Sequence, residues 1–232
     1  VLQYLAAKYN IYIYTGSYFL VKDGKVYNAG SLIDRSGKII GTQKKLHLTD
    51  FEDDLHLSRG VKLEVFPLDF GKVAIPVCMD GTYFETFYLA KNLGADIVIL
   101  PIANNEEYDI YKAMRGIWSR VLETPIVGVK PALNGWLGHI HFTGKAGIFV
   151  PPGWGGLERQ SFGIESGNSL SWLGVFAIAS EPEGDEIITA SLDLNELHKL
   201  RDEMEYGGDV NCLFEKKLFE KYEEIAQSGR FV

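Results

Sequence analysis

The sequence predicts a layered α/β fold in which helices cover the outer faces of β-sheets. Short apolar runs alternate with helical or turn segments along the 232 residues. Several of these runs are rich in Val and Ile and apolar on both faces, as strands inside a layered sheet are. No repeat, low-complexity tract or proline-rich linker divides the chain. We therefore expect residues 1–232 to form a single domain.

The N-terminal part predicts a helix and then an antiparallel meander. VLQYLAAKY places its apolar residues on one helical face. Asp23-Gly24 and Ser36-Gly37 are tight-turn sequences between alternating segments, so strands are expected at 11–20 and 26–33. The chain opens with Val1 and with a helix that no strand precedes. We therefore expect an N-terminal strand and part of the first helix of the domain to be missing.

The remaining chain predicts strand–helix–strand units. Apolar residues recur at helical spacing in 84–93, 108–122 and 194–204. The apolar stripe of the second helix, which we expect in the core, comprises Ile110, Met114, Ile117, Trp118 and Val121. The further strand candidates are 63–68, 73–77, 97–101, 126–129, 146–150, 175–179 and 187–192. The segment GDVNCLFEKKLFEKYEEIAQ predicts a helix that packs on the body or on another subunit.

Composition and charge exclude several classes of function. The net charge is −8 and no Lys/Arg cluster is present, which argues against nucleic-acid binding. No apolar run reaches the roughly 18 residues of a membrane span, and no charged-then-apolar signal segment opens the chain. The two cysteines are too few for a disulfide scaffold and suit a reducing compartment. We therefore expect a cytoplasmic protein with no nucleic-acid or membrane partner.

Cys78 ends the apolar run KVAIPVC, where a buried strand gives way to a turn. Reactive groups of open α/β sheets gather at the carboxyl ends of strands, and the following residues, 79–82, can begin a helix. A helix N-terminus offers free N–H groups and partial positive charge, which favour the nucleophilic thiolate. Cysteine is also a frequent buried filler. Position alone therefore leaves Cys78 open as either a nucleophile or a packing residue.

A second polar stretch, GTQKKLHLTDFEDD, places a lysine and a glutamate seven positions apart. Lys45 and His47 alternate with leucines along an extended segment, and Glu52 follows. A lysine beside a thiol favours the thiolate and stabilises negative charge on an attacked carbonyl oxygen or nitrile nitrogen. A carboxylate near both groups can carry protons. Most single lysines and glutamates lie on solvated surfaces, so this stretch points to catalysis only together with Cys78.

Together the two stretches resemble motifs of the nitrilase superfamily, the carbon–nitrogen hydrolases that act on amides, nitriles and carbamoyl compounds. The lysine motif of that family reads Lys-x-His-Leu, as residues 45–48 do here. Its nucleophile motif is a Cys, an acidic residue two positions on, then an aromatic residue and a Glu. Cys78, Asp80, Tyr83 and Glu85 match that spacing. GADIVILPIAN, SRVLETP, FTGKAGIFVPPG and ASLDLNELHKLR resemble later family segments, so the resemblance covers nearly the whole chain.

The resemblance implies a four-layer αββα sandwich that forms a homodimer or a higher homo-oligomer. It implies that Cys78 attacks an amide or nitrile carbon and forms a thioester or thioimidate. Lys45, with the backbone N–H of Met79, would then hold the developing negative charge. Glu52 would orient Lys45. The implied partners are a small-molecule amide or nitrile and water, with no cofactor and no metal.

One catalytic group of the family has no counterpart in this sequence. The resemblance implies a general-base glutamate before the lysine, but no Glu precedes Glu52. Asp23 and Asp34 are the only earlier carboxylates, and both lie in or beside expected hairpin turns. We expect the base in the missing N-terminal segment. The alternative is a catalytically silent family member that binds a small amide or a partner protein.

The remaining polar and aromatic residues have weaker assignments. His47, Asp80, Tyr83, Glu85 and Asn104 are possible pocket or supporting residues. His47 could pair with Cys78 as in a Cys–His hydrolase, but a structural hydrogen bond is the preferred interpretation, and Asp80 could cap the following helix. His139 and His141 lack a third metal ligand, and Cys212 has no partner motif, so neither set is expected to have a catalytic role. One or two of Trp136, Trp154 and Trp172 could wall a pocket, but packing is the preferred interpretation for each.

Overall fold

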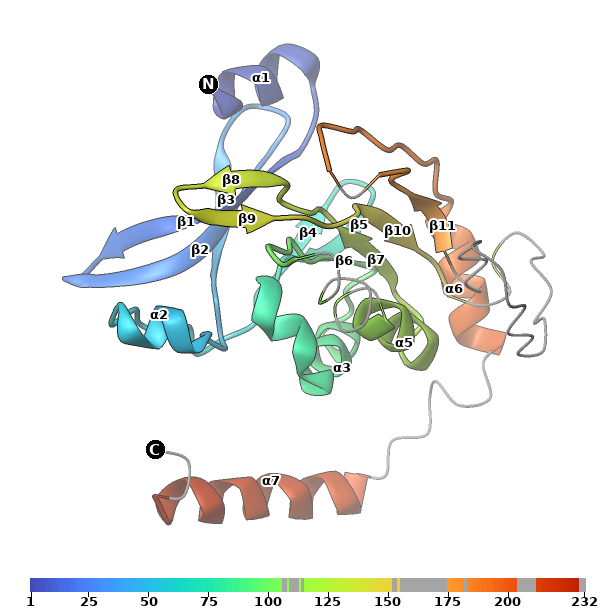
Figure 1. The fold of residues 1–232 in the computed structure, drawn as a ribbon. Coiled ribbons are helices and arrows are strands. Elements are labelled where there is room, and N and C mark those ends of the chain that lie inside the picture. The colour runs from blue at the N-terminus through green and yellow to red at the C-terminus, as the bar shows by residue number, and fades with distance from the viewer. Residues whose placement is uncertain are drawn as a thin grey trace, which may run out of the picture.

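The computed structural model describes residues 1–105, 108, 113, 115–151, 154, 175–181, 183–203 and 212–229. These residues form a mixed α/β structure built on two main sheets (Figure 1). The predicted fold class is therefore confirmed.

The first sheet is a three-stranded antiparallel meander. It consists of β1 (Ile13–Lys22), β2 (Lys25–Ile33) and β3 (Ile39–Lys44), in that order. Asp23 and Gly24 have φ angles of 52° and 71°, which the tight turn between β1 and β2 requires. The meander expected from the turn sequences is thus present, and its third strand leads directly into Lys45.

The second sheet has six strands in the order β11-β10-β7-β6-β5-β4. Their bounds are β4 (Val65–Leu68), β5 (Gly71–Ala74), β6 (Ile97–Ile99), β7 (Val127–Lys130), β10 (Gly147–Phe149) and β11 (Val175–Ile178). The three central strands β5, β6 and β7 run parallel, β4 and β10 pair antiparallel to β5 and β7, and β11 pairs antiparallel to β10. The carboxyl ends of β5 and β6 therefore meet at one edge, where Cys78 follows β5.

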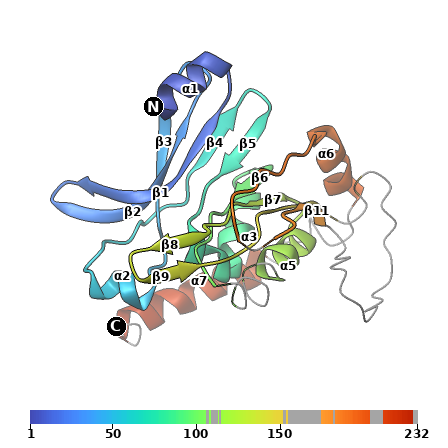
Figure 2. The ribbon, with the colours of Figure 1, turned by 45° about the horizontal axis from the view of Figure 1, so that its top comes forward.

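Helices cover both faces of the second sheet (Figures 1 and 2). On one face, α3 (Phe84–Asn92) and α5 (Arg115–Glu123) contribute Phe87, Ala90, Ile117 and Val121 to a buried cluster with strand residues. On the other face, α6 (Leu194–Glu203) packs through Leu197. The two sheets join through a third cluster formed by Leu32, Phe66, Val73 and Ile75.

Two helices lie at the ends of the chain. The first, α1 (Leu2–Tyr9), precedes β1 and contacts the first sheet. The last, α7 (Cys212–Gln227), runs along the lower side of the molecule in Figure 1. The hydroxyl of Tyr88 on α3 donates a hydrogen bond to Glu215 of α7, so this helix contacts the body, one of its two expected positions.

Several predicted bounds are wrong. Residues 187–192 form no strand, and the Ile187 side chain is exposed. β5 ends at Ala74, four residues before Cys78, and the intervening chain is extended without a sheet assignment. The short helix α2 (Asp50–Asp54) and the two-stranded hairpin of β8 (Gly135–Leu137) and β9 (Ile140–Phe142) were not expected.

The apolar stripe of the second expected helix is supported where the structure describes it. Ile117 and Val121 are buried. Ile110, Met114 and the side chain of Trp118 lie outside the described residues.

Candidate active site

Lys45 and Glu52 form a buried ion pair at the end of the first sheet. Lys45 follows β3 directly, and Glu52 lies in α2, whose N-cap is Thr49. The distance from Lys45 Nζ to Glu52 Oε2 is 2.5 Å, and the Lys45 side chain is only 3% exposed. The Lys45 ammonium therefore does not point to bulk water, and Glu52 fixes its position.

Four hydrogen bonds surround the Glu52 carboxylate. Oε1 accepts from Asn28 Nδ2 at 2.7 Å, and Oε2 accepts from the backbone N–H and the hydroxyl of Thr49 at 2.8 and 2.9 Å, besides Lys45 Nζ. Burial by itself raises the pKa of Glu52, but the bonds from Lys45, Thr49 and Asn28 outweigh it. The pKa of Glu52 therefore lies below its ordinary value, and the carboxylate is ionised at neutral pH.

Asp80 connects the lysine segment to the turn that holds Cys78. Its Oδ1 accepts from the backbone N–H groups of Leu46 and His47 at 3.0 and 2.7 Å, and its Oδ2 accepts from the N–H of Val77 at 2.9 Å. Asp80 is fully buried. One carboxylate thus ties the neighbour of Lys45 to the neighbour of Cys78, and this bridge brings the two sequence motifs together.

Cys78 begins a 3-10 turn, η1 (Cys78–Thr82), that leads into α3. Its φ angle is 45°, a left-handed conformation that few residues other than glycine adopt. The backbone N–H of Cys78 donates to the carbonyl of Pro101 at 3.0 Å, which attaches the turn to the chain after β6. Cys78 is half-buried at the edge of the apolar cluster that includes Leu46, so the residue is not sealed inside the core.

The supporting residues predicted from the sequence fall into two groups. His47 Nδ1 lies 3.1 Å from Asp80 Oδ1, and the His47 ring stacks on Tyr83 with ring centroids 3.9 Å apart. These contacts support the structural interpretation of His47. By contrast, Glu85 is exposed. Asn104 is half-buried, and its carbonyl accepts from Thr143 N.

Two neighbours of the site were not predicted. Asn28 on β2 contacts both catalytic candidates, because its carbonyl accepts from Lys45 N at 2.8 Å and its side chain binds Glu52. Burial, followed by the charge of Asp80, raises the pKa of Tyr14 on β1. Neither residue belongs to a local pattern, since Asn28 contacts the site, and Tyr14 comes under the charge of Asp80, only after the strands pair.

The packing predictions for the tryptophans have mixed outcomes. Trp154 is buried in the cluster under α6, as expected, but Trp136 is 71% exposed and the packing prediction for it is wrong. Trp172, like the side chain of Cys212, lies outside the described residues. Among the residues that are described, no three His, Cys, Asp or Glu side chains come close enough together to hold a metal ion.

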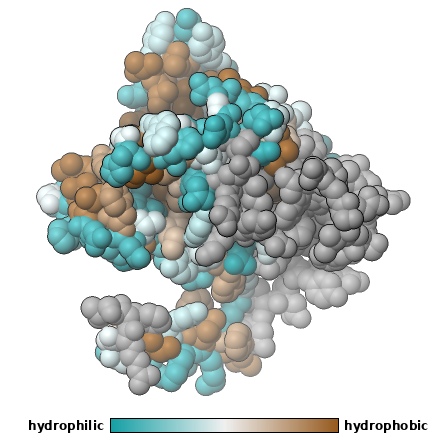
Figure 3. Space-filling view, viewed as in Figure 1, coloured by the Kyte–Doolittle hydropathy of each residue, from teal (hydrophilic) through white to brown (hydrophobic). Residues whose placement is uncertain are grey.

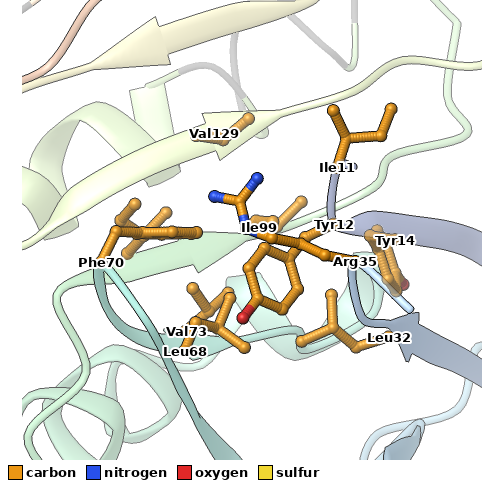
Figure 4. A pocket seen from close by; sticks show the side chains of 11 residues that line it. Ile11, Tyr12, Tyr14, Leu32, Arg35, Leu68, Phe70, Val73, Ile99 and Val129 are labelled. Atoms are coloured by element: carbon orange, nitrogen blue, oxygen red, sulfur yellow. The ribbon is translucent and has the colours of Figure 1, made fainter. Parts of the chain in front are cut away.

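A cavity of about 350 Å³ between the two sheets is separate from this site. Figure 4 shows its mostly apolar wall, into which the Arg35 guanidinium projects beside Tyr12. Arg35 Nε binds Asp69 at 2.8 Å and so does not present a free charge. Cys78, Lys45 and Glu52 do not line the cavity, and the candidate active site is therefore the edge between η1, β3 and α2.

Comparison with known proteins identifies the family. The model of the carbon–nitrogen hydrolases matches residues 1–123, which include the Lys45, Glu52 and Cys78 motifs. The chain belongs to the carbon–nitrogen hydrolase family. The family predicted from the two motifs is thereby confirmed.

Curated relatives of this carbon–nitrogen hydrolase family member carry hydrolase names. The chain is 33% identical over 155 residues to the probable hydrolase YhcX of Bacillus subtilis, covering 63% of this chain and 29% of that protein. It is 29% identical over 128 residues to the citrullinase of Francisella tularensis, covering 51% and 43%. It is 30% identical over 113 residues to the omega-amidase NIT2 of Danio rerio, covering 45% and 41%. The chain thus spans less than half the length of these relatives.

Solved structures of the nitrilase superfamily share the fold. Saccharomyces cerevisiae Nit3 superposes with a TM-score of 0.71 at 23% identity, covering 88% of this chain and 68% of that chain. An amidase mutant from Nesterenkonia sp. AN1, with the acetamide moiety of fluoroacetamide added covalently at its active-site cysteine, superposes with a TM-score of 0.56 at 19% identity. That match covers 64% of this chain and 57% of the amidase. Within the described part of our chain, no helix has both the length and the apolar character needed to cross a membrane.

Proposed function

We propose that this carbon–nitrogen hydrolase family member hydrolyses small amides through a thioester on Cys78. The observation that carries the proposal is the Asp80 bridge, with bonds of 2.7 to 3.0 Å to the lysine segment and to the Cys78 turn. It sets a buried ammonium group beside the segment that holds a half-buried thiol. A thiolate and a fixed cation are what acyl transfer from an amide requires.

The proposed reaction has two stages. The Cys78 thiolate attacks the amide carbon, a C–S bond forms, and the carbonyl oxygen takes the displaced electron pair. Lys45 and the backbone N–H of Met79 stabilise that oxyanion. When it collapses, the C–N bond breaks and the nitrogen leaves as ammonia after taking a proton. Water then attacks the thioester, the C–S bond breaks, and a carboxylic acid and the free thiol result.

Glu52 acts in this scheme as the positioning residue for Lys45. Its carboxylate already accepts four hydrogen bonds, and its pKa is held below the ordinary value. A low pKa makes a weak proton acceptor. The proton from Cys78 therefore goes to another carboxylate, the general base that the family resemblance implies.

The proposed substrate class is based on the names of two relatives. The names citrullinase and omega-amidase denote enzymes for carbamoyl and amide compounds, and we propose an unsubstituted amide or carbamoyl group here, with a nitrile as the alternative. The proposed two-stage reaction uses no cofactor and no metal. A cytoplasmic location and a homodimer remain predictions from the sequence and the resemblance.

An ammonia-release screen tests the proposal. Small aliphatic amides, ω-amides, carbamoyl amino acids and nitriles are incubated with the protein and with Cys78→Ala. We expect release from at least one amide or carbamoyl compound, loss of release in Cys78→Ala, and an acyl mass increment on Cys78 after acid quenching. Binding of an amide by the wild type, without ammonia or an acyl adduct, would instead indicate the catalytically silent alternative.

A further inference from the structure

The β8–β9 hairpin exposes large apolar side chains close to the candidate active site. Trp136 is 71% exposed and Leu137 is 65% exposed. Each strand has three residues, and a two-stranded hairpin of this size is marginally stable in water by itself. Its conformation therefore depends on contacts at its base.

The base of the hairpin is attached to the segment that also holds Cys78. Leu133 N donates to the carbonyl of Ile102, and Thr143 N donates to the carbonyl of Asn104, both at 2.9 Å. Cys78 N donates to the carbonyl of Pro101. The two ends of the hairpin and the Cys78 turn thus bind to three residues of one short segment, Pro101, Ile102 and Asn104. The hairpin follows β7 and the candidate nucleophile follows β5, so both leave the second sheet at the edge where its parallel strands end.

A second set of contacts fixes the hairpin on its other side. Asn134 Nδ2 donates to the carbonyl of Gly184 at 3.2 Å, and His141 Nε2 lies 3.7 Å from Glu183 Oε1. The indole of Trp136 stacks on the His141 ring, with centroids 4.6 Å apart and an interplanar angle of 22°. The indole is held in place before any ligand arrives, which lowers the entropic cost of binding.

The hairpin points toward the elements that hold the lysine side of the site. In both ribbon views it projects from the end of β7 toward the side of the molecule that carries β1–β3 and α2 (Figures 1 and 2). Lys45 follows β3, Glu52 lies in α2 and Cys78 follows β5. The hairpin therefore extends from the nucleophile side of the site toward the lysine side.

The chemistry of the hairpin indicates an uncharged apolar ligand. Residues 133–143, LNGWLGHIHFT, contain no Asp, Glu, Lys or Arg. An indole face binds an aromatic ring by offset or edge-to-face stacking. Two strands of three residues are too small for the roughly 800 Å² per partner of a stable protein interface. A small molecule fits this surface better than a second protein.

We propose that Trp136 determines specificity by binding the aryl group of an arylalkyl amide whose carboxamide reaches Cys78. The proposal rests on the proposed function for the position of the carboxamide. It adds that the non-reacting end of the substrate is aromatic and carries no charge. An ω-amide with a terminal carboxylate would find no lysine or arginine on the hairpin and would be the poorer substrate.

The test compares kcat/KM for phenylacetamide, acetamide and succinamate in the wild type and in Trp136→Ala and Trp136→Phe. Stacking of about 0.5–1.5 kcal/mol corresponds to a change of roughly 2- to 13-fold. We expect Trp136→Ala to lose about that factor for phenylacetamide and to stay within about twofold for acetamide, with Trp136→Phe recovering most of the loss. Phe19→Ala, at another exposed aromatic residue (61% exposed), is the matched control and should change neither rate.

Equal losses for phenylacetamide and acetamide in Trp136→Ala, or a wild-type preference for succinamate, would overturn the assignment of Trp136. Calorimetric titration of phenylacetamide into Cys78→Ser and into the Cys78→Ser, Trp136→Ala double variant tests binding without turnover. Weaker binding in the double variant supports the aryl site even if no amide is hydrolysed. Equal affinity, or no binding in either variant, rejects it. Failure of the aryl site and failure of the hydrolase proposal are therefore distinguishable.

Discussion

The Asp80 carboxylate accepts a hydrogen bond of 2.7 Å from the backbone N–H of His47, 33 positions earlier in the chain. The same carboxylate binds the N–H of Val77, next to Cys78. This single side chain joins the first sheet to the second at the candidate active site. The relative position of Lys45 and Cys78 therefore depends on a residue that need not contact substrate.

Replacing Asp80 should destabilise the protein and disturb the site together. Asp80→Ala removes the acceptor of three backbone N–H groups, those of Leu46, His47 and Val77. Each of these groups that stays buried and unpaired costs about 1–3 kcal/mol of stability. We expect the free energy of unfolding in urea to fall by several kcal/mol. The control is Asp53→Ala, which removes an exposed carboxylate bound to Arg59. This variant should change the free energy of unfolding by less than about 1 kcal/mol. Similar small losses in both variants would contradict the bridging role.

Lys45 should be essential for turnover, whereas its sequence neighbour should not. Loss of one donor to a developing oxyanion costs about 10²- to 10³-fold in kcat, so Lys45→Ala should reduce ammonia release by at least that factor. Lys44→Ala is the control, because Lys44 lies over the Tyr27 ring and does not bind Glu52. Circular dichroism checks that both variants are folded. Unchanged release in folded Lys45→Ala would remove Lys45 from the mechanism.

The buried ion pair of Lys45 and Glu52 predicts a loss of stability in acid. The pKa of Glu52 is lowered in the folded protein, so its contribution is present above the ordinary carboxyl pKa of about 4.3 and is lost as pH falls through the folded value. The free energy of unfolding of the wild type should thus decline below about pH 4.5, and Glu52→Gln should decline less steeply in that range. Unfolding in urea from pH 3 to 7 measures both curves. Parallel curves would show that Glu52 does not titrate as described.

Replacing Gly81 should destabilise the protein for a steric reason. A Cβ on Gly81 would lie 2.2 Å from Leu100 Cδ2, inside the turn that begins at Cys78, whereas a Cβ on Gly116 of α5 would meet nothing within 4 Å. Gly81→Ala should cost about 1–3 kcal/mol of stability through overpacking. Gly116→Ala should be neutral or stabilising by up to about 1 kcal/mol, because alanine favours helices. Thermal unfolding of the two variants compares them directly, and equal melting temperatures would refute the close approach.

Much of the site could be predicted because its chemistry lies in two short motifs. The lysine motif and the cysteine motif are each continuous in sequence, and both lie within residues 1–123, which the family model matches. The bridging role of Asp80 could not be read in advance, since its partners are 33 and 34 positions away and are backbone atoms that carry no residue signature. Asn28 was missed for the same reason.

Errors in the fold arose where elements are short or lack partners. The helix α2 has five residues and begins at a capping box on Thr49, so it is too short for helical periodicity to be detected. Residues 187–192 have strand composition, but the segment pairs with no strand of the described sheets. The exposure of Trp136 was unexpected because a tryptophan usually packs its large apolar surface.

The central claim is that the thiol of Cys78 is reachable and activated as a nucleophile by its surroundings. Iodoacetamide at pH 7, followed by peptide mass spectrometry over time, measures this for both cysteines in the same sample. We expect Cys78 to be alkylated faster than Cys212, and Lys45→Ala to slow Cys78 alone. Slow labelling of both cysteines at one rate, unchanged in Lys45→Ala, would contradict the account.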